Sequence, residues 1–220
     1  FLKEKGVKNI FMLTGYGAMY MNDAIKLNGI KYYATRNEAT APIMASAYAK
    51  SINDIGVACV TAGPGATNAI PGLAAAYVDS APIIVFSGQV DFEHTTYSTK
   101  LKNIRTFGTA EINILPIVKP LTKYCEIIKK PNEVRYILEK AYFYALKGRP
   151  GPVWLDVPLN VQKQEIDFKK LKKFNPKINK NKKLSKYNRK KLIKIISLLK
   201  RSKKPLLVAG NGIKQSGMAK

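Results

Sequence analysis

IGVACVTAGPGATNAIPGLAAAYVDSAPIIVFS, residues 55–87, predicts a strand, a glycine turn, a helix and a second strand in succession. Residues 55–61 and 82–87 are almost continuously apolar, which is typical of strands that are covered on both faces of a parallel sheet. Gly63 and Gly65 interrupt the first apolar run, and the small residues at 66–77 favour a closely packed helix. This order indicates a strand–helix–strand unit of an α/β fold.

The same alternation extends in both directions from this unit. Towards the amino terminus we expect strands at 7–14 and 30–34 and helices at 18–27 and 38–51. Towards the carboxyl terminus, a less regular segment at 89–115 precedes an extended segment at 117–128, a helix at 132–146 and a strand at 153–157. Strands and helices alternating at this interval predict an α/β domain with a doubly wound, mostly parallel sheet and helices on both faces.

The composition changes beyond residue 160. The domain predicted over 1–160 is followed by a Lys/Asn-rich linker at 161–185, then by a basic helix at 186–201 and an apolar strand at 205–209. These last elements predict the truncated start of a second α/β domain over 186–220. Because that strand has no partner after it, and because the chain starts at Phe1, we expect the sequence to be a fragment of a longer protein.

The formal net charge of +24 is concentrated at the carboxyl end, where residues 163–220 hold 20 basic and 2 acidic side chains. Such a tail can bind nucleic acid by releasing counterions, or it can form a solvated linker and helix. We favour the solvated interpretation, without nucleic acid as a partner, because the aromatic residues are not spaced among the lysines as a base-stacking surface requires.

Residue counts exclude several other classes of protein. With 2 cysteines and 1 histidine, the chain cannot form a disulfide scaffold or a four-cysteine zinc site, and no metal site is predicted from its own residues. No apolar run reaches the roughly 18 residues that a membrane-spanning helix requires, so we expect no membrane partner.

Several motifs occur at a spacing that is typical of one enzyme family. They are TGYGAMYMNDAI (14–25), RNEA (36–39), TAGPGATNAIPGLAAAYVDSAPIIVFSGQV (61–90), EINILPIVKPLTKY (111–124) and GRPGPVWLDVP (148–158). Together they resemble the pyrimidine-binding domain of thiamine diphosphate enzymes, specifically the large catalytic subunit of acetolactate synthase and its relatives. The resemblance covers residues 1 to about 160, and residues 205–217 resemble the start of the family's central domain.

The resemblance implies that Glu38 activates the cofactor, by a hydrogen bond from its protonated carboxyl to N1′ of the aminopyrimidine ring. Taken alone, Glu38 is more typical of a surface glutamate at a helix N-terminus, where the helix dipole stabilises it. The resemblance favours the activator. It also places two turns against thiamine diphosphate, through Gly15, Tyr16 and Gly17 in the first and Gly63, Pro64 and Asn68 in the second. The second turn lacks the lysine and hydroxyl residues of a nucleotide-phosphate loop.

Two further positions match residues that contact FAD in acetolactate synthases, namely Ser80 and Arg149. An arginine can bind a phosphate through two parallel hydrogen bonds. Arg149 can equally interact with the C-terminal end of the helix before it. A bound flavin is therefore an expectation, with helix capping by Arg149 as the alternative.

The resemblance implies an enzyme that decarboxylates a 2-oxo acid such as pyruvate and joins the two-carbon unit to a second 2-oxo acid, in the cytoplasm. It implies a homodimer or homotetramer, a small regulatory subunit, and Mg²⁺ and the diphosphate held by a missing C-terminal domain, so we expect this fragment alone to be inactive. Ala39 and Ala110 stand where relatives commonly have glutamine, which leaves room for another substrate. The alternatives are a related decarboxylase or carboligase, a non-catalytic pyrimidine domain, and a nucleic-acid-binding module that uses the basic tail.

Overall fold

The computed structural model describes residues 1–176 and 186–218. It contains two compact units, residues 1–174 and residues 175–220. The predicted linker falls partly outside the described residues, since positions 177–185 are not among them.

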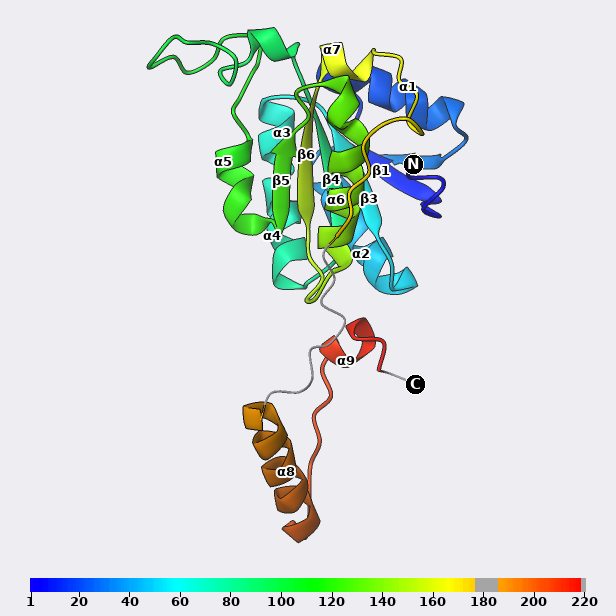
Figure 1. Ribbon diagram of the computed structural model, residues 1–220, viewed down its shortest axis with the longest axis vertical. Coiled ribbons are helices and arrows are strands. Elements are labelled where there is room, and N and C mark those ends of the chain that lie inside the picture. Colours follow the sequence, from blue (N-terminus) through cyan, green and yellow to red (C-terminus); the bar gives the residue numbers. More distant parts are fainter. Residues whose placement is uncertain (177–185, 219–220) are drawn as a thin grey trace. The chain divides into compact units, whose positions relative to one another are not determined.

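The first unit is built on one six-stranded sheet (Figure 1). Its strands are β1 (Asn9–Met12), β2 (Lys31–Ala34), β3 (Gly56–Val60), β4 (Ile83–Gln89), β5 (Tyr124–Ile127) and β6 (Val153–Pro158). They lie in the order β2-β1-β3-β4-β6-β5, and every neighbouring pair is parallel. The predicted α/β fold is therefore confirmed.

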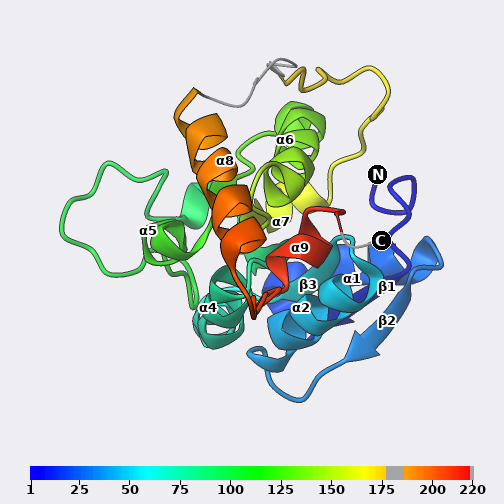
Figure 2. The same ribbon diagram turned by 90° about the horizontal axis from the view of Figure 1, so that it is seen from below.

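Helices cover both faces of this sheet and bury its apolar strands. They are α1 (Met19–Leu27), α2 (Thr40–Ile52), α3 (Pro64–Asn68), α4 (Ile70–Val78), α5 (Leu115–Val118), α6 (Val134–Leu146) and α7 (Leu159–Gln162). Residues of α1, α6 and α7 share one apolar cluster with the sheet, and residues of α2, α3, α4 and α5 share the other. Helices α2 and α4 lie side by side (Figure 2), where alanines and Gly72 permit close packing. Strands β3, β4 and β6 are buried throughout, which explains their continuous apolar sequences.

The prediction of an extended segment at 117–128 is wrong over its first half. Residues 115–118 form α5, residues 119–121 form a 3-10 turn, and only Tyr124–Ile127 form a strand. Pro116 and Pro120 each stand at the start of a helical turn, where the fixed proline φ angle is favourable and the missing N–H costs nothing. The apolar residues between them therefore belong to helical turns.

The boundaries of two predicted helices also differ. The helix predicted at 66–77 is divided into α3 and α4, with Pro71 in the first turn of α4. The helix predicted at 38–51 begins at Thr40, so Glu38 lies in the turn that precedes α2.

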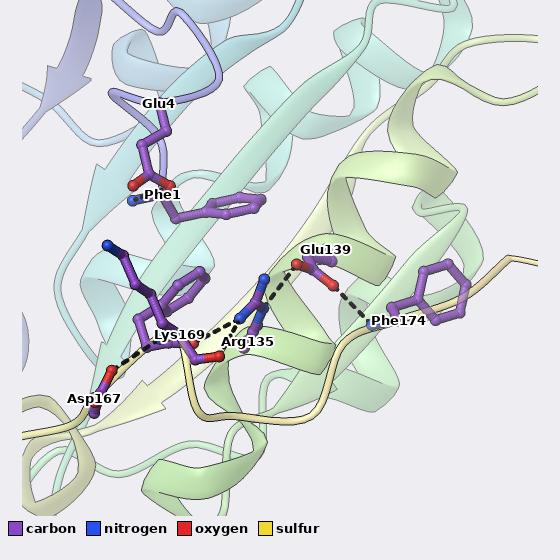
Figure 3. A network of polar contacts seen from close by, with 8 residues as sticks. Phe1, Glu4, Arg135, Glu139, Asp167, Lys169 and Phe174 are labelled. Atoms are coloured by element: carbon purple, nitrogen blue, oxygen red, sulfur yellow. Dashed lines mark hydrogen bonds and ion pairs between the residues drawn. The ribbon is translucent and has the colours of Figure 1, made fainter.

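Residues 163–174 follow α7 and pack back against α6 (Figure 3). The guanidinium of Arg135 binds Oε1 of Glu139 at 3.0 Å and donates to the backbone carbonyls of Phe168 and Lys169 at 3.0 and 2.8 Å. Oε2 of Glu139 accepts a 2.7 Å hydrogen bond from the backbone N–H of Phe174. These bonds explain why the first unit extends to Phe174, beyond the boundary expected at residue 160. The assignment of residues 1–160, 161–185 and 186–220 to three functional regions stays a prediction.

The described part of the second unit holds α8 (Lys186–Arg201) and α9 (Gly212–Gln215). The prediction of a strand at 205–209 is wrong for this structure, because these residues form no strand and Leu206 and Val208 are 87% and 89% exposed. An isolated strand leaves its backbone N–H and C=O groups without partners, so it requires a neighbouring strand. Among the described residues, no helix is long and apolar enough to cross a membrane.

Candidate functional site

The candidate site lies at the carboxyl end of the sheet, between β1 and β3. Strand β2 lies on the far side of β1, and β4 lies on the far side of β3, so the chain leaves these two central strands in opposite directions. In open parallel sheets, such a switch in strand order opens a crevice that commonly binds ligands. Residues 13–18 follow β1 and residues 61–63 follow β3, and both predicted turns therefore meet at this point.

The first turn packs directly against the end of β3. The backbone N–H of Gly17 donates to Oγ1 of Thr61 at 3.1 Å. A Cβ atom at Gly15 would lie 2.5 Å from Cβ of Thr61, and one at Gly17 would lie 2.7 Å from Cβ of Ala62. The two glycines are thus required for close packing of the turns, while the Tyr16 side chain, 68% exposed, points away from them.

The second turn takes a backbone conformation that favours glycine. Gly63 has φ 58° and ψ −125°, a combination that residues with a Cβ atom rarely adopt. Pro64 then starts α3, which ends at Asn68. A Cβ atom at Gly63 would collide with the backbone carbonyl oxygen of Ala110, so the long segment between β4 and α5 passes directly over this turn.

Glu38 and Asn68 meet at the same end of the sheet. Glu38 is half-buried in the connection between β2 and α2, and Nδ2 of Asn68 donates a 2.7 Å hydrogen bond to its Oε2. A Cβ atom at Gly65 would lie 3.0 Å from Oε1 of Glu38, so the glycine keeps the approach to that oxygen open. The structure therefore brings together Glu38, the second turn and Asn68, with the first turn beside them.

Ser80 and Arg149 lie at the opposite end of the sheet. Each precedes a strand, β4 and β6 respectively, whereas Glu38 follows one. The length of β4 separates the two ends by about 20 Å. Nε of Arg149 donates a 2.6 Å hydrogen bond to Oγ of Ser80, which is buried with φ 55°. The two residues thus form a pair of their own, and their role in flavin binding stays a prediction.

A buried polar network beside the site was missed by the sequence interpretation. Asp156 is fully buried in β6, where its two carboxylate oxygens accept hydrogen bonds from Oγ of Ser87 at 2.6 Å and Nε2 of Gln89 at 3.1 Å. Nε1 of Trp154 donates to the same serine oxygen at 2.8 Å. Burial raises the pKa of Asp156 to about 7, the two hydrogen bonds to its carboxylate oppose this rise, and the charge of Glu111 adds to it.

The network continues into residues 107–112, which we call the bridging segment because they cross the second turn. Nε2 of Gln89 also donates to the backbone carbonyl of Ile112 at 3.2 Å. The buried carboxylate of Glu111 accepts hydrogen bonds from Oγ1 of Thr96 at 2.8 Å and from the backbone N–H of Phe107 at 3.2 Å. A detectable signal was the presence of Ser87, Gln89 and Asp156 within otherwise apolar strands, since buried polar side chains require partners.

Comparison with known proteins agrees with the motifs. Residues 1–117 match the model of the thiamine pyrophosphate enzyme family's N-terminal TPP binding domain. The acetolactate synthase large subunit of Lactococcus lactis is 37% identical over 218 residues, which cover 98% of this chain and 36% of that protein. The corresponding subunit of Buchnera aphidicola from Schizaphis graminum is 34% identical over 213 residues, which cover 96% of this chain and 36% of that protein.

A further relative is similar to the same extent. The probable acetolactate synthase large subunit of Methanocaldococcus jannaschii is 36% identical over 222 residues, covering 98% of this chain and 35% of that protein. The chain thus spans about a third of the length of these relatives.

Proposed function

Because this chain belongs to the thiamine pyrophosphate enzyme family and contains its N-terminal TPP binding domain, we propose that Glu38 activates thiamine diphosphate in an acetolactate synthase reaction. The observation that carries this proposal is the Glu38–Asn68 hydrogen bond beside the second glycine turn. A carboxyl group held in one orientation next to open backbone suits a flat heteroaromatic ring with a polar edge.

The residues present fit the pyrimidine part of the cofactor. Gly63 and Gly65 provide backbone without side chains, and a Cβ atom at Gly65 would narrow the space around Oε1 of Glu38. When bound, thiamine diphosphate supplies the carbanion chemistry that decarboxylates a 2-oxo acid such as pyruvate. Glu38 holds a proton for the ring nitrogen, and Asn68 orients the carboxyl group. The same cofactor chemistry would join the two-carbon unit to a second 2-oxo acid.

The proposal also includes FAD at Ser80 and Arg149. Their hydrogen bond uses one of the five N–H donors of the guanidinium, and the exposed position of Arg149 leaves the group accessible to a phosphate. Because this pair lies at the other end of the sheet from Glu38, a flavin there would contact residues that the pyrimidine ring does not. Arg149→Ala should lower the flavin content of the purified protein, measured by absorbance, and unchanged content would contradict the assignment.

Other parts of the assembly belong to the same proposal. As the family resemblance implies, Mg²⁺ and the diphosphate would be held by a C-terminal domain; within residues 1–176 and 186–218 no three His, Cys, Asp or Glu side chains are grouped to hold a metal ion. The relatives are named large subunits, which supports a small regulatory subunit as partner. A homodimer or homotetramer, a role in branched-chain amino acid synthesis and a cytoplasmic location complete the proposal.

The test compares variants of the gene product that contains these residues, supplied with thiamine diphosphate, Mg²⁺ and pyruvate. Glu38→Gln should lower acetolactate formation by about 100-fold or more, as expected on loss of a group that transfers or holds a proton. Glu165→Gln, which changes an exposed glutamate outside both turns, should leave the rate unchanged.

Two results would change the conclusion. Wild-type turnover in Glu38→Gln would remove Glu38 from the activating role. Consumption of another 2-oxo acid without acetolactate formation would favour the alternative of a related decarboxylase or carboligase, which Ala39 and Ala110 leave open.

A further inference from the structure

Asp156 is an unusual residue to find in the middle of a central strand. It is fully buried in β6 between Leu155 and Val157, and a carboxyl group in such surroundings is costly unless its oxygens are hydrogen-bonded. The groups that face it come from β4 and from the segment after β4. They are Ser87 and Gln89, which donate hydrogen bonds, and Glu111 and Tyr97, which interact with it electrostatically. Cys125 of β5 interacts with the same Tyr97.

One of these partners extends from Asp156 to the bridging segment. Nε2 of Gln89 is shared between Oδ2 of Asp156 at 3.1 Å and the backbone carbonyl of Ile112 at 3.2 Å. Oε1 of Gln89 accepts a 3.0 Å hydrogen bond from the backbone N–H of Val90. Rotation of the Gln89 side-chain amide would break all three hydrogen bonds. The bond to Asp156 therefore helps to fix the amide in the orientation that lets Nε2 bind the Ile112 carbonyl.

A second anchor lies at the residue before Ile112. The carboxylate of Glu111 accepts hydrogen bonds from Oγ1 of Thr96 and from the backbone N–H of Phe107. The backbone N–H of Glu111 donates a hydrogen bond to the carbonyl of Gly108 at 3.2 Å. The bridging segment is therefore folded on itself around a side chain that is 1% exposed.

Ala110 lies next to these anchors and has a strained backbone conformation. It has φ 57°, and its carbonyl oxygen contacts Gly63 closely enough to exclude a Cβ atom there. A non-glycine residue keeps such a conformation only where its surroundings enforce it.

We propose that Asp156 is a positioning residue, which acts through Gln89 to hold the bridging segment against the second turn of the cofactor site. The significance of this contact for cofactor binding rests on the proposed function, whereas the positioning itself does not.

The test measures amide hydrogen exchange of residues 107–112 in the gene product that contains this chain. Gln89→Leu removes the connection between Asp156 and Ile112. Ser87→Ala removes a hydrogen bond to the same carboxylate, but it lies outside the route to Ile112. We expect exchange at Phe107 and Glu111 to accelerate at least about tenfold in Gln89→Leu and to change less than about twofold in Ser87→Ala, relative to amides of β3.

Variants of Asp156 itself separate positioning from simple loss of packing. Asp156→Asn keeps an oxygen for Gln89 and should retain protection of the bridging segment, whereas Asp156→Ala should lose it. Equal acceleration in Gln89→Leu and Ser87→Ala, or unchanged protection in a folded Asp156→Ala variant, would overturn the proposal. If Asp156→Ala does not fold, the comparison of the other three variants decides the result.

A second readout links the segment to the cofactor. In an active preparation, Gln89→Leu should raise the concentration of thiamine diphosphate needed for half-maximal rate by about tenfold and should change kcat less. Suppose that the wild-type activity depends on Glu38 but that Gln89→Leu needs no more thiamine diphosphate than the wild type. This result would overturn only the link between the bridging segment and cofactor binding. Absence of cofactor-dependent activity would instead contradict the proposed function, and the exchange result would still stand.

Discussion

The side-chain amide of Asn68 donates a 2.7 Å hydrogen bond to Oε2 of Glu38, although the two residues are 30 positions apart in the sequence. Asn68 ends α3 after β3, and Glu38 follows β2, so the bond connects segments that leave the sheet on either side of β1. It fixes one carboxylate oxygen, while the other faces Gly65. Orientation of Glu38 therefore depends on Asn68 rather than on its own turn.

Removal of this bond should reduce activity without unfolding the domain. Removal of one partner of a hydrogen bond costs about 1–3 kcal/mol, which corresponds to a decrease of roughly 5- to 150-fold in kcat/KM if the bond orients Glu38 for the reaction. We expect Asn68→Ala to show this decrease in the acetolactate assay. Asn160→Ala is the control, because Asn160 donates a similar 2.9 Å bond to Glu93 and also accepts a 3.0 Å bond from the backbone N–H of Phe92, both outside the proposed site. Equal effects of the two substitutions would argue against a specific role for Asn68.

Gly63 can be tested against a glycine of similar φ angle that has open space around it. Gly29 has φ 64° and no atom within 4 Å of the position that a Cβ atom would occupy, whereas a Cβ at Gly63 meets the Ala110 carbonyl. Gly29→Ala should cost about 1–2 kcal/mol of backbone strain, and Gly63→Ala should cost about 1–3 kcal/mol more, because its ψ of −125° lies outside the left-handed region and its Cβ would meet the Ala110 carbonyl. Urea unfolding of the two variants measures this difference. Equal losses would mean that the bridging segment moves away from Gly63 without cost.

Substitution of Ala110 by glycine should stabilise the protein, whereas substitution of Gly63 by alanine should destabilise it. The φ of 57° at Ala110 is unfavourable for a residue with a Cβ atom, so Ala110→Gly relieves strain that exceeds the entropy lost by introducing glycine. We expect the free energy of unfolding to rise by about 0.5 kcal/mol. Ala75→Gly, at an exposed position within α4, should instead lower it by about 1 kcal/mol. Destabilisation by both substitutions would show that Ala110 is not strained in solution.

The fold could be predicted because its strongest signals are local. The strands β3, β4 and β6 are continuous apolar runs, and the turn around Gly63 interrupts the sequence where the structure requires a positive φ angle. The segment at 117–128 was misassigned because apolar residues alone do not distinguish short helical turns from a strand. Pro116 and Pro120 were the signal for helical turns, because proline is favourable in the first turn of a helix.

The site was only partly predictable for a different reason. Glu38 and Asn68 each stand within a recognisable motif, but their hydrogen bond follows from the order of strands, which no local pattern encodes. The bond between Gln89 and Asp156 joins residues 67 positions apart. Either polar residue alone is an exception within an apolar strand, and only the parallel pairing of β4 with β6 places them together.

Arg135 should determine whether residues 167–174 stay attached to α6. Its guanidinium and Glu139 are both largely buried, and together they bind three backbone groups of this segment (Figure 3). Arg135→Met should cost about 1.5–3 kcal/mol and increase cleavage by proteases near Phe168. Lys170→Met removes an exposed ion pair with Asp167 and should cost less than about 1 kcal/mol. Unchanged protease resistance in Arg135→Met would show that aromatic packing alone holds the segment.

Asp156 should make the stability of the first unit decrease as the pH rises. Burial raises the pKa of its carboxyl in the folded state from 3.8 to about 7, so between these values the folded chain binds more protons than the unfolded chain. Its contribution to the free energy of unfolding is then fully present below pH 4 and is lost as the pH approaches 7, by up to about 1.4 kcal/mol per pH unit.

Asp156→Asn removes this contribution, while groups that do not interact with Asp156 titrate alike in the variant and in the wild-type chain. The free energy of unfolding of the wild type, minus that of Asp156→Asn, should fall steadily between pH 5 and 7 and then level off, as measured by urea unfolding at each pH. In Glu111→Gln the fall should shift to lower pH, since the charge of Glu111 helps to raise the pKa of Asp156. A difference that is constant from pH 5 to 8 would mean that Asp156 stays ionised in the folded protein, and its hydrogen bonds to Ser87 and Gln89 would then outweigh the cost of its burial.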